Sequence, residues 1–402
     1  MRKILIVGQQ DGDLTGMNDL VIQCAVDYLS NIGGGTVKIK EGVFEIGSAI
    51  HLRSNINLEG VPGKTIFKKC DNVTSTLATE GDANERQLIL TSPDGFEPGH
   101  TVTIRFEGES LGFLETVAVV TGKEGNTISI DRGLLRDYGI KDKKAIAERN
   151  FPVISGYNCE NINIKGITID GNRDKNSFVG GCRNAGIYFF ESKNIVIEDC
   201  IVEKYKGDGI SYQVCENVTV KNCVLVGNAG HGIHPGSGTT VTLISGCKSY
   251  ENGMDGIFVC WRVTRGVIED CLSYKNAHSG LSIGHKDTNN IIRNNHFYEN
   301  NHCGILFREE IEPMGANYNL IESNIFTNNG SEEYTQKTGC TCKYIGIHIY
   351  GSTHGVKFLK NKFTNENVST EGTAGILVEQ GAYDNIFEDN SFEGCSEEII
   401  IR

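Results

Sequence analysis

Short runs of three to five mainly β-branched residues recur along the chain, and glycine or asparagine closes each run. The most regular run begins with a glycine followed by isoleucine or leucine, and this glycine returns every 23 or 24 residues, at Gly186, Gly209, Gly232, Gly256, Gly280 and Gly304, before the series resumes at Gly346 and Gly375. Runs this short are typical of strands, not helices. Three such runs in each period predict an all-β fold, a single-stranded right-handed parallel β-helix.

A second column of small residues repeats in the same frame. It consists of Cys200, Cys223, Cys247 and Cys271, continued by Asn295, Asn324, Asn361 and Asn390. Because each coil of a parallel β-helix lies about 4.8 Å above the last, residues at equivalent positions stack. We therefore expect an internal column at one turn, in which the four cysteines are buried free thiols. One thiol per coil provides no cluster of ligands, so no metal site is predicted there.

The repeat divides the chain into three regions. Residues 1–83 hold the first coils behind an N-terminal capping helix over 19–30, where apolar residues recur at helical spacing. Residues 84–150 break the repeat with alternating strands and glycine turns, which predicts a small inserted antiparallel β module. Residues 151–402 form the main β-helix, interrupted by a surface loop at 329–343 that carries Cys340 and Cys342. The final run, Ile399–Arg402, has no cap, and we expect truncation there or cover from another subunit.

The composition is globular and acidic. The 402 residues include 38 Lys and Arg against 51 Asp and Glu, a net charge of −13, which disfavours nucleic acid and an anionic membrane as partners. The apolar runs are too short for a membrane helix. The N-terminus lacks the long apolar segment of an export signal, so a cytoplasmic location is the default, or a secreted or periplasmic one if a leader has been removed. Without a leader, the 14 cysteines are expected to be thiols.

The outward positions of the glycine-marked strand are unusual for a solvated sheet face. Strand alternation places the residue after each inward isoleucine outside, together with the residue two further on. Aromatic and charged side chains along such a groove suit a sugar polymer, whose rings stack on Trp and Tyr. We therefore expect a polysaccharide or oligosaccharide partner, bound by Trp261, Arg262, Gln213, Tyr188, Asp287, Glu309 and His348.

Lys286 and Arg308 lie 22 residues apart, nearly one coil, which brings their side chains close together. Such a pair suits β-elimination at a uronate, in which a base removes the proton beside the carboxylate and a cation neutralises that carboxylate. Lys286 is the expected base, with Arg308, His285 and His234 as further catalytic candidates. The alternative is a solvated basic pair opposed by neighbouring acidic residues.

Three polar residues stand in the turns before the glycine-marked strand: Asp208, His231 and Asp255. Both turn capping and catalysis are consistent with this place, so the two aspartates remain catalytic candidates. On a strand, residues three apart face opposite sides. We therefore expect His231 and His234 to point apart and not to share a metal.

Several segments resemble one known superfamily. Gly33-Gly-Gly-Thr-Val37, Gly42-Val-Phe-Glu45 and His51-Leu-Arg-Ser-Asn55 resemble the entry coils of the pectate-lyase-like superfamily, and the coil register over 155–402 resembles the same superfamily. This superfamily contains lyases, hydrolases, epimerases and phage tailspikes, and the fold alone selects none of them.

The segment from His285 to Arg308 is similar to the Lys-then-Arg pair of alginate lyases of the chondroitinase B type. This resemblance implies Lys286 as the base and Arg308 as the assisting acid. It also makes Ca²⁺ a candidate cofactor, although the positions of its carboxylate ligands hold Phe258, Cys260 and His234, so that Arg262 or His285 would have to replace the ion.

A competing resemblance favours hydrolysis. Gly230-His231-Gly232-Ile233 looks like the Gly-His-Gly segment of polygalacturonases. An inverting hydrolase needs two carboxylates roughly 6.5–9.5 Å apart, and the candidate pairs are Asp208 with Asp255 or Asp287 with Glu309. A non-catalytic glycan-binding or tailspike-like protein, which would be a homo-oligomer, is the third interpretation. The first expectation remains a polysaccharide lyase that cleaves a uronate-containing glycan by β-elimination.

Overall fold

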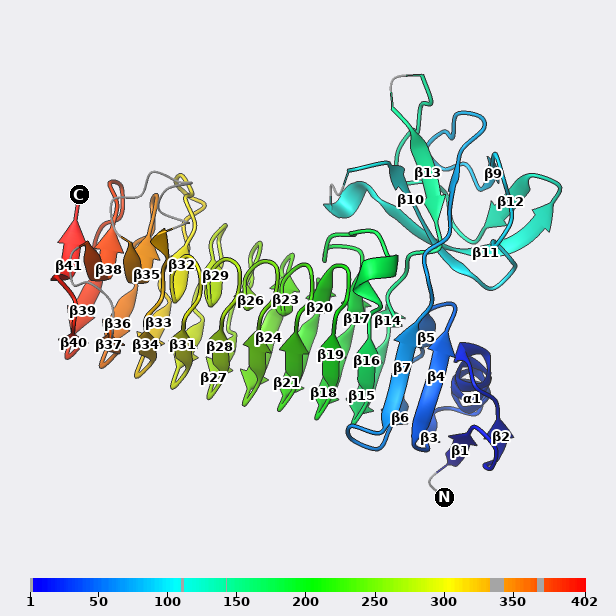
Figure 1. Ribbon diagram of the computed structural model, residues 1–402, viewed down its shortest axis with the longest axis horizontal. Coiled ribbons are helices and arrows are strands. Elements are labelled where there is room, and N and C mark those ends of the chain that lie inside the picture. The colour runs from blue at the N-terminus through cyan, green and yellow to red at the C-terminus, as the bar shows by residue number, and fades with distance from the viewer. Residues whose placement is uncertain (1–2, 110–111, 142, 333–342, 367–371) are drawn as a thin grey trace.

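The computed structural model describes residues 3–109, 112–141, 143–332, 343–366 and 372–402. They form three long parallel sheets wound into one β-helix, with a smaller β module standing over its N-terminal coils (Figure 1). The predicted fold class is therefore confirmed. Cys340 and Cys342 lie outside the described residues. Within the described part of the chain, no helix is long and apolar enough to cross a membrane.

Each sheet takes one strand from each coil. Sheet I runs β2 (Leu14–Thr15), β1 (Ile4–Gly8), β3 (Gly35–Ile39), β6 (Ile56–Glu59), β15 (Glu160–Lys165), β18 (Lys193–Glu198), β21 (Glu216–Lys221), β24 (Thr240–Ser245), β27 (Val267–Glu269), β30 (Ile291–Arg293), β33 (Leu320–Glu322), β36 (Lys357–Leu359) and β39 (Ile386–Glu388).

Sheets II and III contain the other two strands of each coil. Sheet II runs β5 (Ile50–Leu52), β14 (Ile154–Tyr157), β17 (Ala185–Phe190), β20 (Asp208–Gln213), β23 (Ile233–Gly236), β26 (Ile257–Phe258), β29 (Leu281–Ile283), β32 (Ile305–Phe307), β35 (Tyr344–Ile349), β38 (Thr373–Val378) and β41 (Glu397–Ile401). Sheet III runs β4 (Gly42–Ile46), β7 (Thr65–Lys69), β16 (Thr168–Asp170), β19 (Ile201–Glu203), β22 (Val224–Val226), β25 (Lys248–Tyr250), β28 (Leu272–Tyr274), β31 (His296–Tyr298), β34 (Ile325–Thr327), β37 (Lys362–Thr364) and β40 (Ser391–Glu393).

The N-terminal end of the β-helix is covered by α1 (Asp19–Asn31), as the apolar spacing predicts. Ile22, Val26 and Leu29 are buried against the first coils, so the helix shields apolar surface that an open coil would expose.

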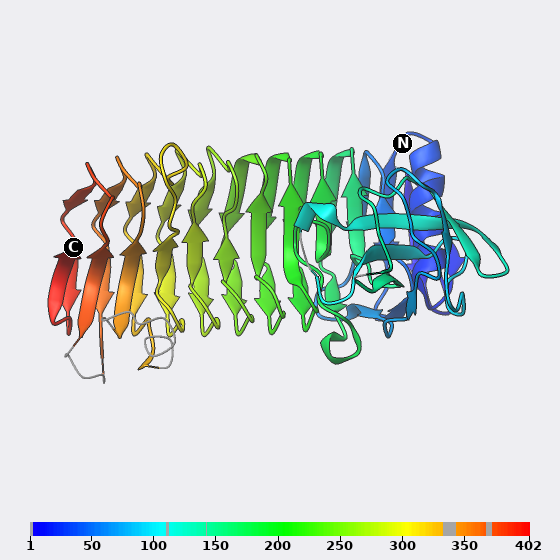
Figure 2. The same ribbon diagram turned by 90° about the horizontal axis from the view of Figure 1, so that it is seen from above.

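The second body is an antiparallel sheet inserted between coils. It runs β8 (Thr74–Thr76), β13 (Ala145–Glu148), β10 (Thr101–Phe106), β11 (Thr116–Glu124), β12 (Thr127–Ile130) and β9 (Gln87–Ile89), with a 3-10 turn, η1 (Gly112–Leu114), before β11. It has its own apolar core, and Figure 2 shows it lying over the N-terminal coils.

The glycine column of sheet II exists because the backbone passes close to interior side chains. A Cβ atom on Gly232 would lie 1.9 Å from Ser249 Oγ, and one on Gly256 would lie 2.0 Å from Ser273 Oγ. Neither distance is tolerable for a side chain, so these two coils require glycine where the backbone bends over the interior serine.

The predicted cysteine–asparagine column is present. Cys200, Cys223, Cys247 and Cys271 are buried free thiols, as expected. Asn295 continues the column, since its Oδ1 accepts the backbone N–H of Cys271 at 3.0 Å. The same bond recurs between successive asparagines up to Asn390. The column therefore satisfies turn N–H groups that would otherwise be buried without partners.

A second interior ladder consists of Asn228, Asn252, Asn276, Asn300 and Asn329, all at most 2% exposed. Asn276 donates to Asn300 Oδ1 at 2.9 Å and to the Ser249 carbonyl at 3.1 Å. Its own Oδ1 accepts the backbone and side-chain N–H groups of Asn252 at 3.2 and 3.0 Å.

His51 joins the inserted module to the β-helix. Its Nε2 lies 2.9 Å from Thr101 Oγ1 in β10, and its Nδ1 lies 2.8 Å from Ser155 Oγ in β14. Burial, assisted by the positive charge of Arg53, lowers the pKa of His51 to about 4. The imidazole is therefore held neutral in the folded protein.

Replacing Asn276 with alanine should lower the free energy of unfolding by about 2–5 kcal/mol, because several buried N–H and C=O groups lose their partners. Chemical denaturation of the two proteins measures the difference. Asn126→Ala is the matched control, since Asn126 is exposed and its side chain makes no hydrogen bond with any described residue; it should change stability by less than about 0.5 kcal/mol. Equal losses in both variants would contradict a structural role for the ladder.

Acid should weaken the folded state through His51. The pKa of His51 is lower in the folded protein than in the unfolded chain. Its contribution to the free energy of unfolding is therefore complete above about pH 6.5 and is lost as pH falls towards 4. The loss is at most about 1.4 kcal/mol for each pH unit in this window. Denaturation at several pH values should show a smaller acid loss for His51→Asn than for the wild type. An unchanged slope between pH 6.5 and 4 would exclude this contribution.

Candidate functional site

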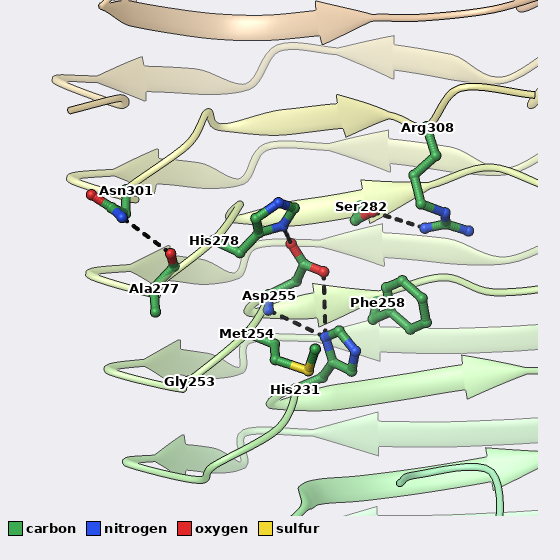
Figure 3. A pocket seen from close by; sticks show the side chains of 10 residues that line it. All are labelled: His231, Gly253, Met254, Asp255, Phe258, Ala277, His278, Ser282, Asn301 and Arg308. Carbon is green, nitrogen blue, oxygen red and sulfur yellow. Dashed lines mark hydrogen bonds and ion pairs between the residues drawn. The ribbon is translucent and has the colours of Figure 1, made fainter. Parts of the chain in front are cut away.

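A cavity of about 450 Å³ opens on the outer face of sheet II, over the coils of β23, β26, β29 and β32. Figure 3 shows its side chains. It is lined by His231, Gly253, Met254, Asp255, Phe258, Ala277, His278, Ser282, Asn301 and Arg308. Of the residues singled out from the sequence, it contains Arg308, Asp255 and the turn residue His231.

His231 and His234 lie on the same face, so the expectation that they point apart is wrong. Their ring centroids are 5.6 Å apart, and both rings contact Phe258, at 4.0 and 4.9 Å between centroids. Strict alternation fails because β23 begins only at Ile233, after the bend at Gly232. The bend turns His231 outward together with the alternating position of His234.

Asp255 organises one side of the cavity. Its Oδ1 lies 2.6 Å from His278 Nδ1 and accepts the Ser279 backbone N–H at 2.9 Å, while Oδ2 lies 3.3 Å from His231 Nδ1. Burial alone would raise the pKa of Asp255, but the hydrogen bonds and positive charge of the two histidines outweigh it and hold the pKa well below its usual range. The carboxylate thus caps a turn and orients two imidazoles at once.

His278 is the most accessible imidazole of this group, with 34% of its side chain exposed. Burial lowers its pKa, but the hydrogen bond and the negative charge of Asp255 have the larger combined effect, so the pKa is raised above 6.5. The Asp255 contact fixes Nδ1 as the bonded atom (Figure 3). His278 therefore has the orientation and the basicity of an acid–base group.

Arg308 forms the opposite side of the cavity. It donates to Ser282 Oγ and to the Val259 carbonyl, both at 2.8 Å, and its guanidinium lies 4.5 Å from the Phe258 ring centroid. One further contact, at 3.3 Å, joins it to Asp287. The side chain is fixed but 20% exposed, which leaves a positive charge at the cavity wall.

Asp287 does not reach the cavity. Its side chain is fully buried and accepts the backbone N–H groups of Val263 at 2.9 Å and Gly284 at 3.0 Å. Burial raises its pKa to about 7 against the effect of Arg308 and the two N–H donors. The expected substrate-binding role for Asp287 is therefore corrected to one of positioning Arg308 and the turn.

Asp208 and His234 form a second buried pair, with 2.7 Å between Oδ2 and Nδ1. The segment after η2 (Arg173–Lys175) lies directly on them, since a Cβ on Gly181 would be 1.8 Å from Asp208 Oδ2. Asp208 also accepts the His231 backbone N–H at 2.9 Å. Among the described residues, His234 Nε2 has no hydrogen-bond partner. The pair points outward from the sheet but is covered.

The segment after η2 also covers two other residues that were expected to bind substrate. Tyr188 and Gln213 are fully buried, although alternation places them on the outer face. The Tyr188 hydroxyl donates to the Cys182 carbonyl at 2.7 Å. His348 is also fully buried, with Nε2 3.2 Å from Glu379 Oε1 and Nδ1 3.3 Å from His302 Nε2. None of these three side chains can meet a substrate in this structure.

The remaining predicted residues gather in the turns beyond the strands. Trp261 is 44% exposed and stacks on His285 at 4.9 Å between ring centroids, and His285 Nδ1 lies 3.3 Å from Glu310. Arg262 and Glu309 are exposed. Lys286 is half-buried, does not line the cavity, and forms no hydrogen bond or ion pair through its ammonium with any described residue.

Sequence reasoning missed His278. It placed Phe258 and Ser282 at outward positions of the glycine-marked strand but gave them no role in the site. The turn column of Asp208, His231 and Asp255 continues with Ser279, and His278 stands one position before it. The repeat therefore gives no signal for His278, whose imidazole reaches Asp255 from beside the column.

The residues present do not fit a calcium site. At the positions where the resemblance places carboxylate ligands, Phe258 and His234 pack against each other. The third position holds Cys260, and burial raises the pKa of its thiol above the ordinary value. Over the described ranges, no group of three or more His, Cys, Asp or Glu side chains is arranged to hold a metal ion.

The carboxylate pairs expected for a hydrolase are also unsuited. Asp208 and Asp255 are at most 4% exposed at the side chain and are engaged by histidines and backbone N–H groups. Asp287 is fully buried, so it cannot act with the exposed Glu309. A general acid must present a proton to the glycosidic oxygen, which these three carboxyl groups cannot do.

Comparison with curated proteins finds no match to the chain. Among solved structures, the A-module of the mannuronan C-5 epimerase AlgE6 from Azotobacter vinelandii is 16% identical, with a TM-score of 0.62 over 96% of this chain and 92% of its own. The exopolygalacturonase of Thermotoga maritima is 16% identical, with a TM-score of 0.61 over 95% and 87%. The Dettilon tailspike protein gp208 is 15% identical, with a TM-score of 0.58 over 96% and 68%. At these identities the likeness shows the fold.

The family itself is shown by a sequence profile. The profile described as "Right handed beta helix region" matches residues 119–245, 154–310 and 236–363, which together extend over more than half of the chain. The handedness predicted from the repeat agrees with this match. The chain therefore belongs to the right-handed β-helix family.

Proposed function

We propose that the protein acts on a uronate-containing polysaccharide or oligosaccharide by removing the proton next to the sugar carboxylate, as in β-elimination. One observation carries the proposal: a fixed guanidinium, Arg308, and an imidazole oriented by a carboxylate, His278, line the same cavity. A sugar acid needs both groups, because its α-proton becomes removable only when the carboxylate is neutralised.

The elimination uses the residues in separate roles. Arg308 pairs with the uronate carboxylate, and the neighbouring Phe258 offers an apolar surface to the ring. His278 takes the proton from C5, and the electron pair of the C–H bond forms the C4=C5 double bond. The C4–O bond then breaks, and the leaving oxygen takes the proton from the His278 imidazolium, which returns to its neutral form. Asp255 stabilises the positive charge that forms on the His278 ring in between.

One fold neighbour, a mannuronan C-5 epimerase, supports this proposal. A C-5 epimerase also begins by removing the C5 proton, and differs by returning a proton to C5 without cleavage. Elimination and epimerisation therefore share the groups described here, and the fate of the intermediate separates them. Hydrolysis is disfavoured because the aspartates beside the cavity are buried and engaged.

We assign the base to His278 in place of Lys286, the base expected from the sequence. Lys286 would need neighbouring cations to lower its pKa, yet it does not share the cavity with Arg308. Lys286 remains a useful test residue because it was the base expected from sequence and lies nearby in the turn after β29.

His278→Gln should lower turnover of the wild type's best substrate by about 10²-fold or more, because the base is lost while the fold stays intact. A panel of uronate polysaccharides, followed by ultraviolet absorbance of the new double bond and by a reducing-sugar assay, identifies elimination. Deuterium uptake at C5 in D₂O without new chain ends identifies epimerisation. Lys286→Ala is the matched control and should stay within about twofold. An inactive Lys286→Ala beside an active His278→Gln would return the base to Lys286.

The pH dependence should follow His278. Because a base acts in its neutral form, kcat/KM should rise with pH through the raised pKa of His278, above 6.5. Asp255→Asn removes the carboxylate that raises this pKa, so the imidazole should titrate at least about one unit lower. NMR titration of the His278 ring in the two proteins measures the shift directly. An unchanged His278 pKa in Asp255→Asn would refute the orientation described here.

A further inference from the structure

A second cavity, of about 340 Å³, lies between the inserted module and the β-helix. The module contributes Glu115, Val117, Arg132 and Leu135, and the β-helix contributes Tyr157, Asn158, Arg183, Phe190 and Glu191. The cavity is separate from the site around His278, with no lining residue in common. Its volume lies in the lower part of the range of small-molecule sites, roughly 300–1,000 Å³.

Two arginines at this cavity are held over aromatic rings. Arg132 lies 5.4 Å from the Tyr157 ring centroid, and Arg183 lies 5.4 Å from that of Phe190. Arg183 is also fixed by a 2.9 Å hydrogen bond to the Phe113 carbonyl in η1. Among the described residues, Arg132 forms an ion pair with its neighbour Asp131 alone, at 3.4 Å, and 46% of its side chain is exposed. The guanidinium groups are therefore presented from both walls of the cavity.

Two buried hydrogen-bond donors at the cavity lack partners among the described residues. They are the hydroxyl oxygen of Tyr157 and Nε of Arg183. Buried polar groups are nearly always paired, so two unpaired donors at one cavity indicate a missing ligand that accepts hydrogen bonds. Burial raises the pKa of Tyr157 to about 12 although both arginines oppose the rise, so the hydroxyl stays protonated and donates.

We propose that this cavity is a distal subsite for an acidic sugar residue of the same glycan. Arg132 and Arg183 supply cations for its carboxylate, Tyr157 donates a hydrogen bond, and the aromatic rings of Tyr157 and Phe190 contact the sugar ring. The exposed carboxylate of Glu191 at the rim suits a sugar hydroxyl. The inference rests on the proposed function for the substrate class, and adds a binding site that needs the inserted module.

The geometry connects the two cavities. Phe113 lies under Arg183, at 5.0 Å, and its ring centroid is 6.5 Å from that of Trp261. Trp261 is exposed beside the coils of the first cavity. Four coil steps separate β14, which bears Tyr157, from β26, which bears Phe258. At about 4.8 Å per coil this is about 19 Å along the axis, so a long glycan reaches both cavities and a short one does not.

The decisive variant is Tyr157→Phe, because it removes only a hydroxyl that bonds no described residue. We expect unchanged thermal stability and about tenfold weaker binding of a long oligouronate, measured by calorimetry with an inactive His278→Gln background. Binding of a mono- or disaccharide at the first cavity should not change. Arg132→Met should weaken the long ligand similarly, whereas Arg86→Met, an exposed arginine of the same module outside the cavity, should not.

The following outcomes would contradict the proposed subsite. Equal binding of the long ligand by Tyr157→Phe, Arg132→Met and the wild type would exclude the cavity, as would equal affinity for a neutral oligosaccharide of the same length. Failure of wild type to bind any oligouronate would also reject it. Because the readout is binding, loss of elimination activity alone would count against the proposed function and leave this result standing.

Discussion

Hydrogen bonding between parallel strands of successive coils is the constraint on which the rest of this molecule depends. It fixes the rise per coil at about 4.8 Å and places each residue above its counterpart one period earlier. Every choice of side chain is thereby repeated as a column, whether of cysteine, asparagine or glycine. A buried amide such as Asn276 is stable because the coils on either side supply its donors and acceptors. The same regularity that satisfies the interior also determines which groups can meet outside.

The site arises where a column changes its residue type. Asp208, His231 and Asp255 stand in the turns before sheet II, where backbone N–H groups of the next coil need acceptors. The carboxylates of Asp208 and Asp255 accept such N–H groups. A capping carboxylate can still accept further hydrogen bonds. Asp255 uses this capacity to bind His278, so a residue of a structural column also orients an imidazole, with no change in the backbone.

The periodic part of the structure was predictable, and the departures from it were not. The spacing of the glycines specifies the coils, and the apolar spacing over 19–30 specifies α1. Tyr188 and Gln213 were misplaced because the cover over them comes from an irregular segment whose path no periodicity reveals. Trp261 and Lys286 have backbone φ angles of 66° and 63°, so they lie in turns, where strand alternation says nothing about side-chain direction.

The proposed acidic substrate is compatible with an acidic protein, because charge acts locally. The net charge is −13, and screening limits the reach of exposed charges to about 10 Å at moderate salt. A bound carboxylate interacts mainly with the charged groups within this distance. The carboxylates of Asp255 and Asp287 are each committed to donors within the wall, whereas Arg308 keeps part of its guanidinium at the cavity surface. At the cavity wall, the Arg308 guanidinium is therefore more accessible than the carboxylate of Asp255.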